Sequence, residues 1–437
     1  MKLYLTLVIL FFIGGCEKVE TLNGDSNDSF NNSAVIVSLQ DSDNVAIVNA
    51  ATLEIQDQIN IDLVNCLEIS NQMECEMAGC LWHAMDSGTS HCMTNHNHDH
   101  DMGDGFYQPH DIAVDNINGY WFTTAMMGTK VAMYSVEDNE LVASYSTSSM
   151  PALLSIDEVN RKIYVSGGNP SMGETNKILE LTYNENSLEL VEEWDVQFTY
   201  AHGIHFDESS GYVFAVSKTV DYIAKFNPNE PQVPFVNPII ISMDSAINDN
   251  FTIETKRLWP IDITGKYPYI FVTCSAGDWN FGLEYEQIPG QVQMWHMEDM
   301  NLLTTYEFDA YSSPWHIEVS PIEDKFYVAL SGGDGENGSS NSGAACIEYS
   351  AIDNQYSMNE SWRTTSSEYG NLHGITLHSD CEGNYHVYST GRTDGNIYKF
   401  DALTGEQLNS ANLVLTGSVR TGGIDSFIPP CNDICCD

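Results

Sequence analysis

The chain has 437 residues, and its 62 Asp and Glu against 16 Lys and Arg give a formal net charge of −46 at pH 7. Such a charge repels polyanions, so it excludes nucleic acids and anionic membrane surfaces as partners. A hydrophobic content of 42% and an aromatic content of 11% exclude a disordered acidic chain, because enough apolar surface is present to offset the entropy lost on folding. Small cations are the partners that this composition favours.

The amino terminus reads MKLYLTLVILFFIGGC, with one Lys, an apolar run and two glycines before Cys16. The run is too short to span a bilayer of about 30 Å, so residues 1–15 are predicted to be a signal peptide. The small residues before Cys16 resemble a bacterial lipobox. This resemblance implies lipid attachment at Cys16, a tether over 16–33 and an exported protein, periplasmic or on the cell surface, that meets the membrane through its anchor only. An ordinary signal peptide with an incidental Cys is the alternative.

A Cys-rich and His-rich insertion is expected over 62–108. Apart from Cys16 the chain has ten cysteines, an even number as disulfides require, and an exported protein keeps its disulfides. Four of them lie in this insertion, which resembles the disulfide knobs of plexin-type repeats; they are Cys66, Cys75, Cys80 and Cys92. A Cys-rich tail follows at 431–437, and its pairing with the remaining cysteines stays open, as does a zinc site in the tail.

Six segments of the chain share one layout: an apolar strand, a polar turn and a second strand of β-branched and aromatic residues. They include PHDIAVDNINGYWFTTA at 109, AHGIHFDESSGYVFAVS at 201 and PWHIEVSPIEDKFYVAL at 314, and further copies begin at 151, 258 and 372. Two more strands follow most copies, which gives four strands per repeat and predicts an all-β propeller over 34–430. Three strands near the amino terminus and one from Thr421 complete a seventh blade. The repeats NRKIYVSGG, DKFYVAL and YPYIFVTC resemble YVTN and NHL-type propellers, which implies the fold but not an activity.

The first strand of each repeat is predicted to line the central channel. Side chains alternate along a strand, so the residue between two core-facing aliphatics points away from the core. The residues at this position are small or polar, and they are Ala113, Ser155, His205, Asp262, Glu318, Thr376 and Asp425. The preceding position adds Asp111 and His316, and the start of the strand adds His110, His202 and His373.

Histidines from four blades are therefore expected to meet at the channel mouth where the first strands begin. Neutral imidazole is a common ligand for copper and zinc, and carboxylates can orient it. The predicted metal-site residues are His110, His202, His205, His316, His373, Asp111, Asp262, Glu318 and Asp425. Two alternatives stay open. The imidazoles pack against neighbouring blades without a metal, or the carboxylates Asp262, Glu318 and Asp425 hold Ca²⁺ with oxygen ligands.

A second metal-binding tract is predicted in the insertion, just before His110. The sequence HCMTNHNHDHDMGDG contains His91, His96, His98 and His100, and His-rich tracts bind divalent metals. The alternative is a solvated linker. Long connections elsewhere fall at the same mouth, as expected for a ligand-binding face.

The His ring is similar in outline to nitrous oxide reductase, an exported seven-bladed propeller whose inner strands supply histidines to a copper cluster. The resemblance implies metal ligation at His110, His202, His316 and His373, but the chain lacks the cupredoxin domain of that family. No dinucleotide fingerprint, P-loop, G-x-S-x-G or H-E-x-x-H motif is present, so no nucleotide cofactor is expected. The first hypothesis is a module that binds a metal ion and a protein or small ligand. The alternatives are a metal-dependent oxidoreductase or lyase, with His205 or Asp262 as acid or base, and a structural surface protein.

Overall fold

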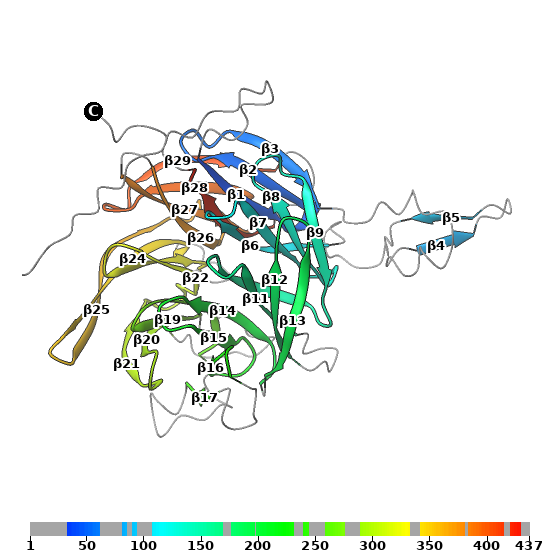
Figure 1. The fold of residues 1–437 in the computed structure, drawn as a ribbon. Coiled ribbons are helices and arrows are strands. Elements are labelled where there is room, and N and C mark those ends of the chain that lie inside the picture. The colour runs from blue at the N-terminus through cyan, green and yellow to red at the C-terminus, as the bar shows by residue number, and fades with distance from the viewer. Residues whose placement is uncertain are drawn as a thin grey trace, which may run out of the picture.

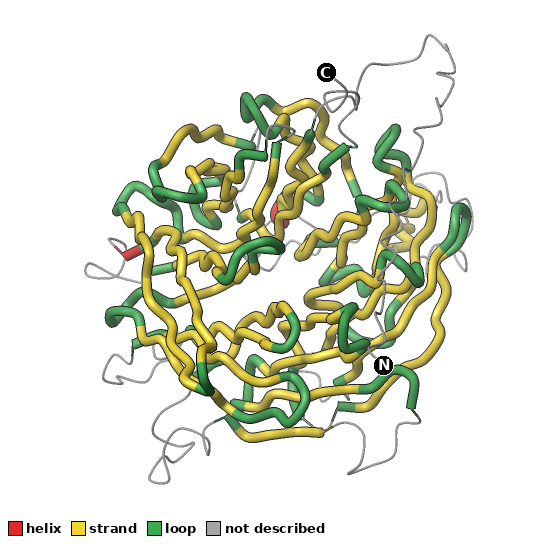
Figure 2. The backbone as a smooth tube through the Cα atoms, turned by 60° about the vertical axis from the view of Figure 1, so that its left-hand side comes forward, coloured by secondary structure: helices red, strands yellow, loops and turns green. Residues whose placement is uncertain are grey.

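The structure is a computed structural model. It describes residues 33–61, 81–84, 90–93, 107–168, 176–196, 198–230, 239–243, 258–275, 289–332, 341–380, 383–414 and 420–429. Within these ranges the strands form seven four-stranded sheets and one two-stranded sheet. The seven sheets stand around a common axis as the blades of a propeller (Figures 1 and 2). The predicted fold is confirmed.

The strands are numbered in chain order, and each blade is named by its place in the chain. Blade 1 contains β6 (Pro109–Asp115), β7 (Tyr120–Ala125), β8 (Lys130–Ser135) and β9 (Leu141–Ser146). Blade 2 contains β10 (Pro151–Asp157), β11 (Lys162–Gly167), β12 (Lys177–Tyr183) and β13 (Leu188–Asp195). Blade 3 contains β14 (Ala201–Asp207), β15 (Tyr212–Ser217), β16 (Tyr222–Phe226) and β17 (Ile239–Ser242). Blade 4 contains β18 (Pro260–Lys266), β19 (Tyr269–Cys274), β20 (Gln291–His296) and β21 (Leu302–Glu307).

The remaining blades follow the same pattern. Blade 5 contains β22 (Pro314–Val319), β23 (Lys325–Leu330), β24 (Gly343–Ile352) and β25 (Gln355–Thr365). Blade 6 contains β26 (Leu372–Ser379), β27 (Tyr385–Gly391), β28 (Asn396–Asp401) and β29 (Gln407–Asn412). Blade 7 contains β30 (Thr421–Phe427), β1 (Ala34–Leu39), β2 (Asn44–Asn49) and β3 (Ile55–Asn60), and a 3-10 turn, η1 (Gln40–Ser42), joins β1 to β2.

Blade 7 is built from both ends of the chain, as predicted. Its sheet has the order β3-β2-β1-β30, so the last strand of the chain is its inner strand. Strands β1 and β30 pair antiparallel, with Ala34 opposite Phe427 and Val37 opposite Ile424. This pairing closes the ring and removes the free sheet edge of an open array.

Apolar side chains form a separate buried cluster between each pair of neighbouring blades. Between blades 7 and 1, for example, Ile36 and Ile47 pack with Trp121 and Tyr134. Trp121 and Tyr134 are stacked, with ring centroids 4.1 Å apart. Fully burying one large apolar side chain contributes about 1.5–3 kcal/mol, so each interface stabilises the ring substantially. The core is therefore a ring of interfaces and leaves the axis to polar side chains.

Buried hydroxyl groups tie neighbouring blades together near the channel. In five of the seven interfaces, a hydroxyl on the second strand of one blade donates to a backbone carbonyl on the inner strand of the following blade. The pairs are Thr124 with Ala152, Ser166 with His202, Thr273 with Trp315, Thr390 with Gly422 and Ser38 with His110. The acceptor lies two residues before the shared core aliphatic every time. These bonds fix the backbone at the position where three of the four predicted histidines stand.

A β-bulge recurs at the start of the inner strands. The register shifts between Pro109 and Ile112 in β6, between Ala201 and Ile204 in β14, and at matching places in the other blades. A bulge places two residues of one strand opposite one residue of its partner and re-aims their side chains. It allows both His110 and Asp111, which are adjacent in sequence, to serve the channel.

Several predictions fall outside the described residues or on side chains that are not described. They are Cys16 with the signal and tether, the disulfide candidates Cys66, Cys75, Cys80 and Cys92, and the tract His91, His96, His98 and His100. In this insertion the structure describes only a backbone hairpin, β4 (Leu81–Ala84) with β5 (Ser90–Met93). Among the described residues, Cys274 and Cys346 are buried and form no disulfide. No helix of the described part is long and apolar enough to cross a membrane.

Candidate functional site

Four histidines from four blades meet at one end of the channel, and we call them the His quartet: His110, His202, His316 and His373. Their ring centroids are 5.7 Å apart for His110 and His202, and 6.4 Å apart for His202 and His316. The distances are 4.8 Å between His316 and His373 and 6.1 Å between His373 and His110. All four side chains are buried, with exposed fractions from 1% to 7%. The convergence of these residues, which are spread over more than half of the chain, agrees with the sequence prediction.

Each ring of the quartet has one nitrogen held by a protein group. His202 Nδ1 donates to the Ile261 carbonyl at 2.7 Å, and His316 Nδ1 donates to Asp262 Oδ2 at 2.8 Å. The side-chain amide of Gln40 lies 2.5 Å from His110 Nδ1. In His202 and His316 these bonds place the hydrogen on Nδ1 and leave Nε2 with a lone pair. A donated Nδ1 hydrogen and an open Nε2 are typical of metal-ligating histidines.

The other ring nitrogens of the quartet are largely unpartnered. His110 Nε2, His316 Nε2 and His373 Nδ1 are buried and have no hydrogen-bond partner. Leaving a buried polar atom unpaired costs about 1–3 kcal/mol, and native proteins retain few such atoms. Three of them lie on neighbouring rings, and each lacks a partner among the residues that the structure describes.

Two cations, Lys218 and Arg392, stand beside the quartet at the same mouth. Lys218 follows β15, and its Nζ lies 5.0 Å from the ring centroid of Trp315 and 5.9 Å from that of Tyr200. Arg392 follows β27, and its Nη1 donates to His373 Nε2 at 3.2 Å and to the Thr421 carbonyl at 3.2 Å. Both side chains are partly exposed. The described residues thus place two cations beside the quartet, in a chain whose net charge is strongly negative.

Burial and these cations keep three of the imidazoles, His110, His202 and His373, neutral. Desolvation lowers the pKa of His110, His202 and His373 well below the usual value, and the charge of Lys218 lowers each of the three further. Burial, with the charge of Arg392, lowers the pKa of Lys218 to about 7. At neutral pH these three rings are thus uncharged, and protons do not compete with a metal for them.

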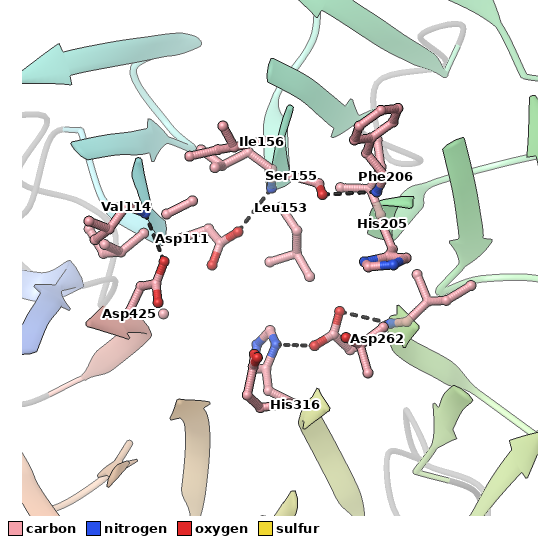
Figure 3. Close-up of a pocket in the computed structure, with 18 of the residues that line it drawn as sticks. Asp111, Val114, Leu153, Ser155, Ile156, His205, Phe206, Asp262, His316 and Asp425 are labelled. Atoms are coloured by element: carbon pink, nitrogen blue, oxygen red, sulfur yellow. Dashed lines mark hydrogen bonds and ion pairs between the residues drawn. The ribbon is translucent and has the colours of Figure 1, made fainter. Parts of the chain in front are cut away.

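The opposite half of the channel is an acidic cavity of about 400 Å³ (Figure 3). It begins at the His316–Asp262 pair and widens toward the ends of the inner strands. Its polar lining includes Asp111, Ser155, His205, Glu318 and Asp425. These predicted channel residues therefore face one space, as the alternation of strand side chains implies. His205 and Glu318 lie in this cavity and not in the quartet.

Several of the channel carboxylates also bind the backbone of the next blade. Asp111 Oδ2 accepts from Leu154 N at 2.9 Å, and Asp425 Oδ2 accepts from Val114 N at 2.7 Å. Asp262 Oδ2 accepts from Ile317 N at 3.3 Å in addition to His316. The polar character of this position is therefore not by itself evidence of a binding site. Polar residues at this position also join the blades.

Burial makes the cavity carboxyl groups hard to ionise. It raises the pKa of Asp111 to about 7 and that of Asp425 to about 6, and it raises the pKa of Glu318 well above its usual value. Burial also lowers the pKa of His205 to about 4, and His205 Nε2 is buried without a partner. These pKa values apply without a bound cation, which would favour the ionised carboxylates. Binding of Ca²⁺ in this cavity therefore stays a prediction. In the described part of the chain, no group of three or more His, Cys, Asp or Glu has the geometry of a formed metal site.

Sequence reasoning missed three members of the site. All three lie outside the inner strands. Gln40 is the first residue of η1, which follows β1, and Lys218 and Arg392 directly follow β15 and β27. The signal that could have found them is positional. In each repeat the end of the second strand lies at the same mouth as the start of the first, because the two strands are antiparallel.

Comparisons with known proteins support the fold. The chain is similar to a protein of unknown function from Desulfotomaculum acetoxidans, with a TM-score of 0.59 and 12% identity over 91% of this chain and 100% of that one. It is similar to a periplasmic gluconolactonase from Pseudomonas aeruginosa, with a TM-score of 0.57 and 10% identity over 91% and 99%. A putative 6-phosphogluconolactonase from Bacteroides fragilis gives a TM-score of 0.55 and 10% identity over 92% and 100%.

At these identities the likeness defines the class, a seven-bladed β-propeller, and not an activity. No protein-family model matches the chain, so the resemblance to YVTN and NHL repeats is not confirmed. No curated protein matches it either.

Proposed function

We propose that this protein is an exported, lipid-anchored propeller that binds copper or zinc at the His quartet. His202 and His316 would bind it through Nε2. His110 would complete a set of three once the Gln40 side chain presents its amide oxygen to Nδ1, because the amide nitrogen that lies there leaves the ring hydrogen on Nε2. The fourth coordination position would be open to a further ligand. The observation that carries the proposal is the division of roles within the rings. Their Nδ1 atoms contact protein groups, whereas Nε2 of His110 and of His316 is buried without a partner. Three protein ligands with one open position are typical of zinc sites that bind substrates.

His373 has a different role in this proposal. Arg392 donates to its Nε2, so the neutral ring carries its hydrogen on Nδ1. A nitrogen that carries a hydrogen donates and does not ligate. We therefore assign His373 to the ligand that occupies the open position and not to the metal.

Binding requires a small inward movement of the rings. Two imidazoles on one zinc ion have centroids about 5 Å apart, because the Zn–N distance is about 2.0 Å. The rings of His110, His202 and His316 are 5.7 Å and 6.4 Å apart for the two neighbouring pairs. The proposal therefore requires each of these two pairs to approach by about 1 Å when the ion binds.

Metal analysis tests the proposal. In a chain with His91, His96, His98 and His100 replaced by Asn, to remove the insertion as a competing site, we expect one Cu²⁺ or Zn²⁺ per protein. The double variant His202→Gln/His316→Gln should lose this ion. The control is His378→Gln, because His378 lies on the same strand as His373, is buried, and also has unpartnered nitrogens, yet stands outside the quartet. Electron spin resonance of the Cu²⁺ form should show splitting from imidazole nitrogens. The proposal fails if the double variant retains the ion or if the control loses it.

An enzyme that uses the same metal is the second candidate function. The observation that favours it is Lys218, whose pKa of about 7 suits proton transfer at neutral pH. The oxidoreductase alternative predicts a Cu centre that is reduced and reoxidised reversibly, whereas a lyase or hydrolase predicts activity with Zn²⁺. Cyclic voltammetry of the Cu form and an assay of lactone opening with the Zn form separate the two. The gluconolactonases named above motivate the lactone as a first probe.

A further inference from the structure

The two cations beside the quartet have no carboxylate partner among the described residues. Elsewhere in the described chain Lys and Arg side chains commonly pair with acids, as Arg420 does with Asp41 and Arg363 with Asp309. Lys218 instead contacts aromatic rings, and Arg392 contacts an imidazole and a carbonyl. In a chain with 62 acidic residues, two neighbouring cations that no described carboxylate pairs with are unexpected.

The surroundings of Arg392 and Lys218 do not offset their repulsion. Asp41 is the carboxylate that favours the charge of Arg392, but Arg420 holds it through Nε at 2.7 Å. Asp262, the carboxylate at the quartet, accepts from His316, Ile317 and Ile263. The charge of Arg392 disfavours the charge of Lys218, and neighbouring like charges destabilise the fold unless a negative group lies between them.

A third donor stands next to the cations. His373 Nδ1 carries its hydrogen, because Nε2 accepts from Arg392, and it is buried without a partner. The His373 side chain is 1% exposed and lies between the rings of His316 and Trp315, with centroids 4.8 Å and 5.3 Å away. Its hydrogen is therefore available to an acceptor that enters the mouth.

We infer that the mouth of the channel binds a small oxyanion, of the carboxylate class, between Lys218, Arg392 and His373. A guanidinium and an ammonium group together are a common cradle for a carboxylate, the first by directed hydrogen bonds and the second as a point charge. The rings of Tyr200 and Trp315 form the wall behind Lys218. The inference deepens the proposed function, because the anion would occupy the open coordination position of the metal. The residues that would bind the anion, however, are not the proposed metal ligands.

Calorimetric titration with acetate, oxalate and sulfate tests the inference, on the protein with bound metal and after metal removal. Lys218→Met and Arg392→Gln should each weaken binding of the best anion by at least tenfold, and His373→Gln should weaken it severalfold. Arg161→Gln is the matched control, because Arg161 is an exposed cation in the turn after β10, at the opposite mouth. It should bind the anion as the parent does.

Metal content of each variant separates this inference from the proposed function. Lys218→Met and Arg392→Gln should keep the ion and lose the anion. Binding of the anion to metal-free protein, with the same dependence on Lys218, supports the inference even where no metal is found. The inference is overturned if no anion binds in either form, or if Arg161→Gln weakens binding as much as the variants at the mouth.

Discussion

Replacing Asp262 by Asn should weaken metal binding through His316. The Asp262 carboxylate accepts the Nδ1 hydrogen of His316 at 2.8 Å, which fixes the tautomer with Nε2 open and makes that nitrogen more basic. Loss of such an outer carboxylate typically costs 10–100-fold in metal affinity. This corresponds to about 1.4–2.7 kcal/mol of binding free energy.

Asp425 provides the matched control, because it occupies the equivalent position of the inner strand of blade 7. Its Oδ2 accepts from Val114 N at 2.7 Å, and its Oδ1 accepts from Ser426 N and from the Thr376 hydroxyl. It therefore ties neighbouring blades as Asp262 does but contacts no imidazole in the described structure. Asp425→Asn should bear a similar structural cost and leave metal affinity within about twofold of the parent, well short of the change expected for an outer-shell carboxylate.

Competition with a chromophoric Zn²⁺ chelator at pH 7 measures both variants. The parent should be the chain without the histidines of the insertion, so that one site is titrated. Equal weakening in the two variants would show that the effect comes from the loss of charge or from strain between blades. An unchanged affinity of Asp262→Asn would show that His316 does not bind the metal through Nε2.

Three further predictions concern the stability of the ring. Thr273→Val removes the hydroxyl that donates to the Trp315 carbonyl and should lower the free energy of unfolding in urea by about 1–3 kcal/mol, since that carbonyl is buried; an unchanged midpoint would contradict a role between blades. Gly203→Ala places a Cβ 2.7 Å from the Asp262 Cα and should cost about 1–3 kcal/mol by overpacking, with a lowered melting temperature as the readout. Asp425→Asn should change the pH dependence. Burial raises the pKa of Asp425 to about 6, above the unfolded value of about 3.9. The parent therefore loses stability as the pH rises from 4 to 6. In urea titrations at pH 4 and 7, the variant should lack about 1–3 kcal/mol of this loss. Parallel curves for the two proteins would refute the assignment.

The fold could be predicted because its signal is repeated. Each blade buries the same alternating pattern of aliphatic residues, so six weak copies together determine the strand register. The three strands at one end of the chain and the single strand at the other add up to the four strands of a seventh blade. The position of the histidines follows from the same register. The start of every inner strand is at one mouth, and His110, His202 and His373 occupy the same place two residues before the shared aliphatic.

The contents of the site could be predicted only in part, because alternation fails at the bulge. Strict alternation would send adjacent residues such as His110 and Asp111 to opposite faces, whereas the register shift between Pro109 and Ile112 re-aims both. The cations Lys218 and Arg392 carry only the positional signal described above. They follow second strands, and no periodic pattern marks a single basic residue in a connection.

The direction of the strands explains why one channel has two chemically different ends. All inner strands run the same way along the axis, so residues before the core aliphatic gather at one end and residues after it at the other. The first group supplies imidazoles and lies near the ends of second strands, where Lys218 and Arg392 stand. The second group supplies carboxylates and His205, which face the acidic cavity of about 400 Å³ together with Asp111 from the first group. The His316–Asp262 pair joins the two groups. A shift of one residue in an inner strand would turn its channel-facing side chains toward the core. The buried hydroxyls that fix the backbone at this register therefore also fix the chemistry of the mouth.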